Sequence, residues 1–214
     1  MFDDNKTKKR ILILAPHADD GEFGAGGSIS KLQSHGHIIN YVSFASVAKY
    51  APPELPKDFY ITELKEATKY LNIPPDNLII YDFEVRKLNY VRQEILEEMI
   101  KIRDDFHPDL VFLPSPNDTH QDHGTISSEG IRAFKYTSLL GYELPWNTIQ
   151  FNTQAFIKLT SRHLDDKIGA ISAYKSQTNR PYFDVDFIKG LAKTRGVQIG
   201  AEYAEAFEVI RWVL

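Results

Sequence analysis

The feature that most constrains the fold is a short apolar run, Ile-Leu-Ile-Leu-Ala at residues 11–15, which ends at Pro16. An uninterrupted run of this kind is typical of a parallel strand that is buried on both faces. Parallel strands need long crossover connections, which are usually helices. The run therefore predicts a parallel sheet with helices packed on both of its faces.

Strand-like and helix-like patterns alternate along the rest of the chain. The first two thirds predict further strands at residues 37–45, 77–84 and 110–115, and helices at 26–35, 61–73, 90–106 and 125–136. The less regular tail predicts a strand at 156–160, a helix at 164–177 and a strand at 203–214. This alternation predicts βαβ units and a mostly parallel sheet. No linker interrupts it, so one domain is expected over residues 1–214, with the polar residues 1–9 frayed.

Composition and charge exclude several classes of protein. The net charge is -4 and the isoelectric point about 6.0, which argues against a general nucleic-acid binder. No stretch approaches the roughly 20 apolar residues of a membrane helix, so no membrane insertion and a cytoplasmic location are expected. The chain has no cysteine, and any metal must therefore be held by histidine and carboxylate side chains.

Two polar loops, residues 16–20 and 117–124, follow two of the predicted strands. Together they contain three of the seven histidines of the chain, with four aspartates. The carboxyl ends of parallel strands are where open α/β sheets bind ligands. Two neutral imidazoles and one carboxylate, with open positions for water, form a known catalytic zinc arrangement. The two loops therefore predict one metal site.

The adjacent acids Asp19 and Asp20 fit a division of labour at such a site. One carboxylate binds the cation, and the other accepts a proton from the water that the cation activates. Asp19 suits the second role because the nearby cation keeps it ionised. Asp118 and Asp122 either orient the ligand histidines from behind or serve as loop hydrogen-bonding groups. Turn formation and helix capping are the competing interpretation of either loop alone.

Four glycines, Gly21, Gly24, Gly26 and Gly27, follow the first loop. Glycines after a strand and before a helix are also found in dinucleotide-binding folds. Their spacing here does not form the G-x-G-x-x-G pattern. We interpret them as backbone positions that pass close to the sheet and to the site.

Two motifs about a hundred residues apart resemble those of the PIG-L/LmbE-like family of zinc-dependent N-deacetylases. The sequence His-Ala-Asp-Asp-Gly at residues 17–21 is similar to the family motif His-Pro-Asp-Asp-Glu. The sequence His-Gln-Asp-His at residues 120–123 is similar to His-x-Asp-His. Residues 173–177 and 203–207 also look like later landmarks of the family, so the likeness spans nearly the whole chain.

The resemblance implies a role for each central residue. It implies one zinc ion per chain, bound by His17, Asp20 and His123. It implies Asp19 as the general base and His120 as the group that stabilises or protonates the tetrahedral intermediate. It also implies a Rossmann-like three-layer α/β fold, with the site at the carboxyl ends of the strands, and hydrolysis of an acetyl amide on a sugar-containing substrate.

The chain departs from the family pattern at three positions. Ala18 replaces the usual proline and Gly21 the usual glutamate, although Glu22 follows directly. Tyr60 stands near the place where the family often has an arginine. A contact from that arginine is then either missing or supplied by another residue, such as Lys49 or Arg86.

Several stretches also resemble bacterial members associated with cell-surface polysaccharide synthesis. This suggests an N-acetylhexosamine as substrate, with a nucleotide or a lipid attached. Candidate substrate contacts are Arg180, Arg195, Trp146 and Tyr60.

Two other functions remain open from the residues alone. One is a different metal-dependent hydrolase such as a phosphoesterase, which would use two metals. The other is a non-catalytic sugar- or nucleotide-binding protein on the same fold. The family often assembles, which is compatible with a homo-oligomer.

Overall fold

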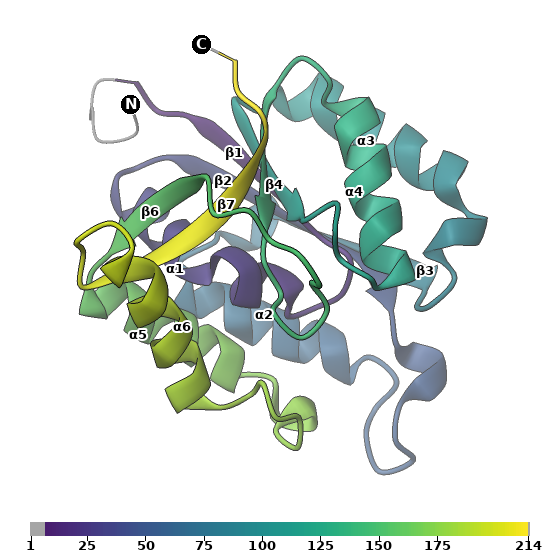
Figure 1. Ribbon diagram of the computed structural model, residues 1–214. Coiled ribbons are helices and arrows are strands. Elements are labelled where there is room, and N and C mark those ends of the chain that lie inside the picture. The colour runs from purple at the N-terminus through teal and green to yellow at the C-terminus, as the bar shows by residue number, and fades with distance from the viewer. Residues whose placement is uncertain (1–6, 214) are drawn as a thin grey trace.

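The computed structural model describes residues 7–213 and contains one seven-stranded sheet in the order β3-β2-β1-β4-β5-β7-β6 (Figure 1). The strands are β1 (Arg10–Ala15), β2 (Ile38–Ser46), β3 (Leu78–Glu84), β4 (Leu110–Pro114), β5 (Ser138–Tyr142), β6 (Ala155–Leu159) and β7 (Tyr203–Arg211). The helices are α1 (Asp20–Ser34), α2 (Phe59–Tyr70), α3 (Arg92–Phe106), α4 (Gln121–Ala133), α5 (Ser161–Ser172) and α6 (Val185–Val197). Four short 3-10 turns connect them, η1 (Ala48–Tyr50), η2 (Pro75–Asn77), η3 (Leu88–Tyr90) and η4 (Lys175–Gln177).

Strands β1 to β5 are parallel, and β7 joins antiparallel to both β5 and β6. The predicted mostly parallel sheet is therefore confirmed. The chain leaves β1 in one direction to form β2 and β3, and it later returns on the other side to form β4 and β5. The order thus reverses between β1 and β4, and this switch point is where open α/β sheets form a ligand crevice.

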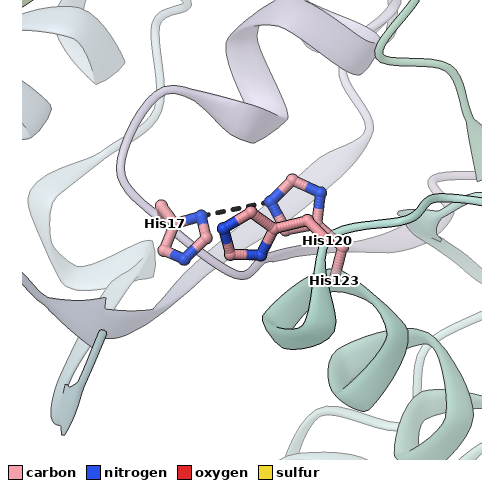
Figure 2. Close-up of side chains that lie close together, drawn as sticks. All are labelled: His17, His120 and His123. Carbon is pink, nitrogen blue, oxygen red and sulfur yellow. Dashed lines mark hydrogen bonds between the residues drawn. The ribbon is translucent and has the colours of Figure 1, made fainter. Parts of the chain in front are cut away.

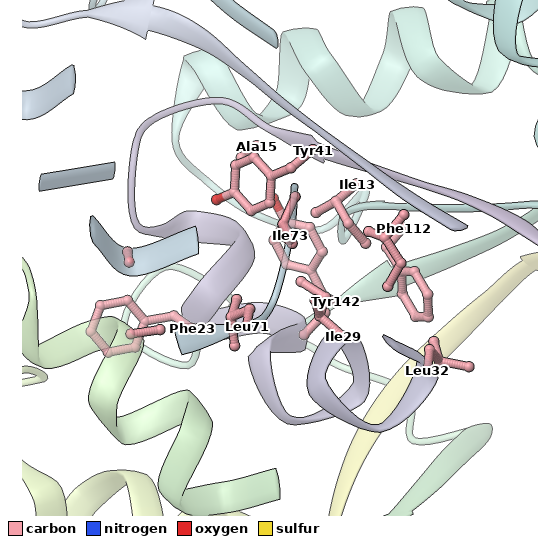
Figure 3. Packing of buried hydrophobic residues seen from close by; sticks show 14 of the residues in the cluster. Ile13, Ala15, Phe23, Ile29, Leu32, Tyr41, Leu71, Ile73, Phe112 and Tyr142 are labelled. Atoms are coloured by element: carbon pink, nitrogen blue, oxygen red, sulfur yellow. The ribbon is translucent and has the colours of Figure 1, made fainter. Parts of the chain in front are cut away.

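The first strand shows how the three layers arise. Ile11 and Ile13 pack into the cluster that contains residues of α1, α2, α5 and α6. Leu12 and Leu14 point to the opposite face and pack with residues of α3 and α4. All four side chains are fully buried, as expected for a strand covered on both faces. Figure 3 shows Ile13 packed among other residues of the first cluster. The three-layer α/β architecture is confirmed.

Both helices that carry site residues begin earlier than the sequence predicts. Helix α1 begins at Asp20 rather than residue 26, and α4 begins at Gln121 rather than residue 125. Glycine has low helix propensity, so the pattern around Gly21 and Gly24 favours a later start. In the folded chain, packing overrides this preference. A Cβ at Gly24 would lie 2.3 Å from the Tyr142 ring, so the close packing of α1 against this ring requires glycine. The early starts place Asp20 and His123 in first helical turns.

The tail contains two elements that the sequence pattern did not predict, β5 and α6, and α5 ends at Ser172 rather than residue 177. At the other end, residues 7–9 precede β1 without regular structure, and residues 1–6 lie outside the described part of the chain. None of the helices within residues 7–213 is long and apolar enough to cross a bilayer.

Candidate functional site

The two predicted loops meet at the carboxyl ends of β1 and β4. These strands are parallel neighbours, with Ile11 opposite Leu110. His17 lies two residues after the end of β1, whereas His120 is the N-cap of α4 and His123 lies in its first turn. Figure 2 shows the three imidazole rings facing one another across this junction. The strand order thus brings together residues that are about a hundred positions apart.

Three side-chain atoms form a small triangle at the centre of the site. Nδ1 of His17 lies 3.1 Å from Oδ2 of Asp20 and 3.1 Å from Nε2 of His123. The third side, between Nε2 of His123 and Oδ2 of Asp20, is 3.2 Å. Each of these atoms has a lone pair that can bind a cation, so the triangle is a candidate metal site.

The far nitrogen of each triangle histidine contacts a buried carboxylate. Nε2 of His17 lies 3.0 Å from Oδ2 of Asp122, and Nδ1 of His123 lies 2.8 Å from Oδ2 of Asp118. An imidazole that donates its N–H to a carboxylate on one side presents a lone pair on the other. Asp118 and Asp122 therefore lie where they can orient the histidines, which is one of the two roles predicted for them.

Backbone amides hold these two carboxylates in place. Asp122 accepts hydrogen bonds from the N–H groups of Arg86 at 2.6 Å and Leu88 at 3.2 Å. Asp118 accepts one from the N–H of His120 at 2.8 Å. The orientation of both triangle histidines is thus tied to the backbone of the neighbouring turns.

His120 lies beside the triangle rather than in it. Its Nδ1 accepts the backbone N–H of Asp122 at 3.2 Å, and its ring stacks on that of His123 at 4.5 Å between centroids. Burial and the neighbouring His17 lower the pKa of His120 to about 4, so the ring is neutral. A neutral ring that accepts at Nδ1 carries its proton at Nε2. His120 is therefore a hydrogen-bond donor toward the site, although its ring nitrogens are also near enough to those of His17 and His123 to add a ligand.

Asp19 is the one acid of the site without a partner. It is the N-cap residue of α1, in a left-handed conformation with φ of 100°, yet its side chain makes no capping hydrogen bond. Within residues 7–213 its carboxylate forms no hydrogen bond or ion pair. Burial and the adjacent Asp20 raise the pKa of Asp19 well above its usual range. The capping interpretation of this residue therefore does not describe the structure, and the carboxylate is free to meet a ligand.

The two histidines and the carboxylate of the triangle shift one another's pKa values. Burial favours neutral histidines, but Asp20 and the orienting carboxylates raise the pKa of His17 to about 9 and of His123 to about 10. Burial also opposes ionisation of Asp20, yet the two histidines hold its pKa well below the usual range. The site is thus built to hold positive charge next to Asp20.

A hollow of about 590 Å³ opens above the triangle. Trp146 and Arg180, two of the four predicted substrate contacts, line it. Arg86, one of the options for the missing family arginine, and the unpredicted Tyr182 line it as well. The other two predicted contacts do not. Tyr60 is buried, and Arg195 forms a two-pronged ion pair with Glu143, with both N–O distances 2.7 Å.

Glu22 lies behind the site rather than in it. It is fully buried and accepts hydrogen bonds from the hydroxyls of Tyr41 at 2.5 Å and Tyr174 at 2.9 Å. The Tyr41 ring also fills the space that a side chain at position 21 would need, because a Cβ at Gly21 would lie 2.5 Å from the Tyr41 hydroxyl. The glycine at position 21, which replaces the usual glutamate, therefore leaves room for the Tyr41 ring that donates to Glu22.

A Rossmann-like sheet with histidines and carboxylates gathered at its switch point defines an α/β protein with a candidate metal site. The model of the PIG-L family, described as GlcNAc-PI de-N-acetylase, matches residues 12–134, which is more than half of the chain. The chain belongs to this family of deacetylases.

Relatives named as deacetylases match most of the chain. The uncharacterized deacetylase YaiS of Escherichia coli strain K12 is 26% identical over 176 residues, covering 79% of this chain and 92% of YaiS. The diacetylchitobiose deacetylase of Thermococcus kodakarensis is 23% identical over 224 residues, covering 94% of this chain and 83% of that enzyme.

Solved structures that share the fold include the N,N'-diacetylchitobiose deacetylase of Pyrococcus horikoshii and a hydratase. The hydratase is GalB of Pseudomonas putida KT2440, the 4-carboxy-2-hydroxymuconate hydratase. It superposes with a TM-score of 0.78 at 17% identity and covers 96% of this chain and 98% of its own. At this identity the likeness shows the fold alone, and the reaction has to be argued from the site.

Proposed function

We propose that this protein is a zinc-dependent hydrolase that removes the acetyl group from an N-acetylated sugar, of the N-acetylhexosamine type. The observation that carries the proposal is the triangle of His17, Asp20 and His123 beside the unpartnered carboxylate of Asp19. Membership of a deacetylase family and the diacetylchitobiose deacetylase among the relatives support the substrate class.

The dimensions of the triangle fit a zinc ion. Zinc binds nitrogen and oxygen ligands at about 2.0–2.2 Å, which places two tetrahedral ligands about 3.3 Å apart. The three sides measured here are 3.1, 3.1 and 3.2 Å. Nδ1 of His17, Oδ2 of Asp20 and Nε2 of His123 would hold the ion. When bound, zinc lowers the pKa of a water molecule and polarises the acetyl carbonyl.

Asp19 is the general base of the proposed reaction. Its carboxylate lines the hollow next to the triangle and is not engaged elsewhere in residues 7–213. Burial beside Asp20 opposes ionisation of Asp19, whereas positive charge in the triangle favours it. An ionised Asp19 accepts the proton of the attacking water and holds it for a later transfer.

His120 stabilises the oxyanion that develops on the acetyl carbonyl. The hydrogen bond from the backbone N–H of Asp122 to Nδ1 leaves the N–H of Nε2 to donate. A donor fixed before the reaction stabilises developing charge without reorganisation. The protonated Asp19 then donates the proton that it took from the water to the leaving amine, while the neutral His120 keeps its Nε2 proton.

The test is acetate release from a panel of N-acetylhexosamines, free and glycosidically linked, by the zinc-loaded protein. We expect turnover by the wild type and a loss of about 10²–10⁴-fold in kcat for Asp19→Asn, because that is the usual contribution of a positioned base. Zinc content of the variant serves as the control and should stay unchanged. Near-normal turnover by Asp19→Asn would contradict the assignment.

The two rival functions predict different results in the same assay. A two-metal phosphoesterase would bind about two ions per chain and hydrolyse phosphate esters rather than amides. A binding protein would hold the sugar unchanged and release no acetate. Within residues 7–213 one group of three or more metal-capable side chains is present, which favours a single ion.

A further inference from the structure

We infer that Glu208 of β7 is a positioning residue of the candidate metal site, because it holds the loop after β4 in the conformation from which Asp118 orients His123. Glu208 comes from neither site loop, and its hydrogen bonds run to residues other than those of the triangle. The inference rests on the proposed function, since it takes the triangle to hold zinc. It deepens that function by adding a residue that neither motif contains.

Glu208 is a buried carboxylate on which four hydrogen-bond donors converge. The residue is only 5% exposed. Its Oε2 accepts the hydroxyl of Ser115 at 2.5 Å, and its Oε1 accepts the side-chain amide of Asn117 at 3.3 Å. Oε1 also accepts the backbone N–H and the side-chain amide of Asn152, at 3.1 and 3.2 Å. Burying a carboxylate is costly unless such partners replace water, so the folded chain keeps these donors gathered around it.

The first two partners belong to the loop that carries Asp118. Ser115 follows β4 directly, and its hydroxyl accepts the backbone N–H of Asn117 at 3.1 Å. The carbonyl of Ser115 accepts the backbone N–H of Asp118, also at 3.1 Å. Oδ2 of Asp118 in turn lies 2.8 Å from Nδ1 of His123. An unbroken run of hydrogen bonds therefore leads from Glu208 to a candidate metal ligand.

The third partner, Asn152, belongs to a second segment that contacts Asp118. This segment, residues 143–154, connects β5 to β6. Its residue Thr148 pairs with Asp118 in an isolated antiparallel bridge. Glu208 thus fastens both the loop that carries Asp118 and the segment that pairs with it.

Glu205 of the same strand is the matched comparison. It lies three residues earlier and is equally buried. Its carboxylate also accepts several hydrogen bonds, but they come from Lys167 of α5 and from the N–H groups of Gly27 and Ser28 in α1. These partners belong to helices and not to a site loop. Replacing Glu205 should therefore weaken the fold, whereas replacing Glu208 should also disturb the metal site.

The test compares the zinc affinity of Glu208→Gln and Glu205→Gln with that of the wild type, by competition with a chelator. Glutamine keeps the shape of glutamate but presents an N–H group to partners that themselves donate, so the loop loses part of its support. We expect Glu208→Gln to weaken zinc binding about 5–20-fold, less than the roughly 10–100-fold usual for a group that contacts the ligand directly. Glu205→Gln should lower the urea midpoint and keep zinc affinity within about twofold of wild type.

A double-variant cycle separates positioning from a general loosening of the fold. If Glu208 acts through Asp118, it should matter little once the Asp118 carboxylate is gone. In the Asp118→Asn background, Glu208→Gln should therefore change zinc affinity by less than about twofold. Full additivity of the two losses would overturn the inference. Wild-type affinity in Glu208→Gln, or an equal loss in Glu205→Gln, would overturn it as well.

Amide hydrogen exchange of the metal-free protein gives a readout that does not depend on zinc. The backbone N–H of His120 donates to Oδ1 of Asp118 at 2.8 Å, so its exchange rate reports on the placement of this carboxylate. We expect Glu208→Gln to raise this rate at least about 5-fold over Glu205→Gln, as the loss of one hydrogen bond would. Equal rates would refute the role of Glu208. A wild type that binds no zinc would refute the proposed function instead, and the exchange rate would still decide the role of Glu208.

Discussion

Two clusters of buried charge lie against helix α1, and they differ in how completely they are satisfied. The first joins Lys167 of α5 to Glu205 of β7 at 2.6 Å. Lys167 also donates to the carbonyl of Phe23, and Glu205 accepts from the N–H groups of Gly27 and Ser28. Each charge has a partner, and the cluster fastens the middle of α1 to its neighbours.

The second cluster is the candidate site at the N-terminal end of α1, and it is incomplete. The three candidate metal-ligand atoms of His17, Asp20 and His123 lie within 3.2 Å of one another. The carboxylate of Asp19 has no partner in residues 7–213. Asp19 is half-buried and lines the hollow, so its carboxylate is accessible to a ligand. The comparison teaches that the first cluster satisfies its charges within the fold, whereas the second leaves one carboxylate available, as the proposed function requires.

Breaking the complete cluster should cost the most stability and leave the site intact. Lys167→Met leaves Glu205 charged, buried and without its cation, which typically lowers the free energy of unfolding by about 3–5 kcal/mol. Urea unfolding measures this loss, and zinc content should not change. The double variant Lys167→Met/Glu205→Gln removes both charges and should recover part of the loss. A neutral effect of the single variant would mean that this cluster does not stabilise the fold.

Removing the donor beside the triangle should affect catalysis and not the metal. His120→Ala deletes the N–H that we assign to the oxyanion, and loss of one such donor costs about 10²–10³-fold in kcat. The measurement is steady-state acetate release together with zinc content. Loss of zinc in this variant would make His120 a fourth ligand instead.

The carboxylates behind the histidines should tune metal affinity. Asp118→Asn and Asp122→Asn weaken the hydrogen bonds that orient His123 and His17, and such changes usually cost about 10–100-fold in affinity. Competition with a zinc chelator measures the dissociation constant. Asp109→Asn, an exposed acid before β4, is the matched control. Equal affinities for all variants would show that backbone geometry alone positions the histidines.

The glycines of α1 should give the smallest effect. A Cβ at Gly24 would lie 2.3 Å from the Tyr142 ring, so Gly24→Ala overpacks the core and should cost about 1–3 kcal/mol of unfolding free energy. Gly190 in α6 has no atom within 4 Å of its Cβ position. Gly190→Ala should therefore stabilise by about 0.5–1 kcal/mol. Thermal denaturation separates the two signs.

Local patterns were enough to predict the centre of the fold. The apolar run of β1 has side chains buried on both faces, and the two loops at β1 and β4 meet because their strands are parallel neighbours. Helix starts were less predictable, since the glycines of α1 serve contacts with Tyr41 and Tyr142 that no local pattern reveals.

Contacts between residues that are far apart in the sequence also could not be predicted. Arg195 is predicted as a substrate contact, but it pairs with Glu143, which lies 52 residues earlier in the chain. Tyr60 is predicted at the substrate, yet it lies in the first turn of α2 and is buried. Arg86 was one of several options for a missing arginine. Its left-handed backbone and its hydrogen bond to Asp122 distinguish it, and both are features of the folded chain.

The most direct test of the central claim is the metal content of the purified protein, measured by mass spectrometry after zinc is offered and excess is removed. The account predicts about one zinc ion per chain in the wild type and in His120→Ala, and essentially none in His123→Ala. Two ions per chain, no ion in the wild type, or full occupancy in His123→Ala would contradict the triangle as the metal site.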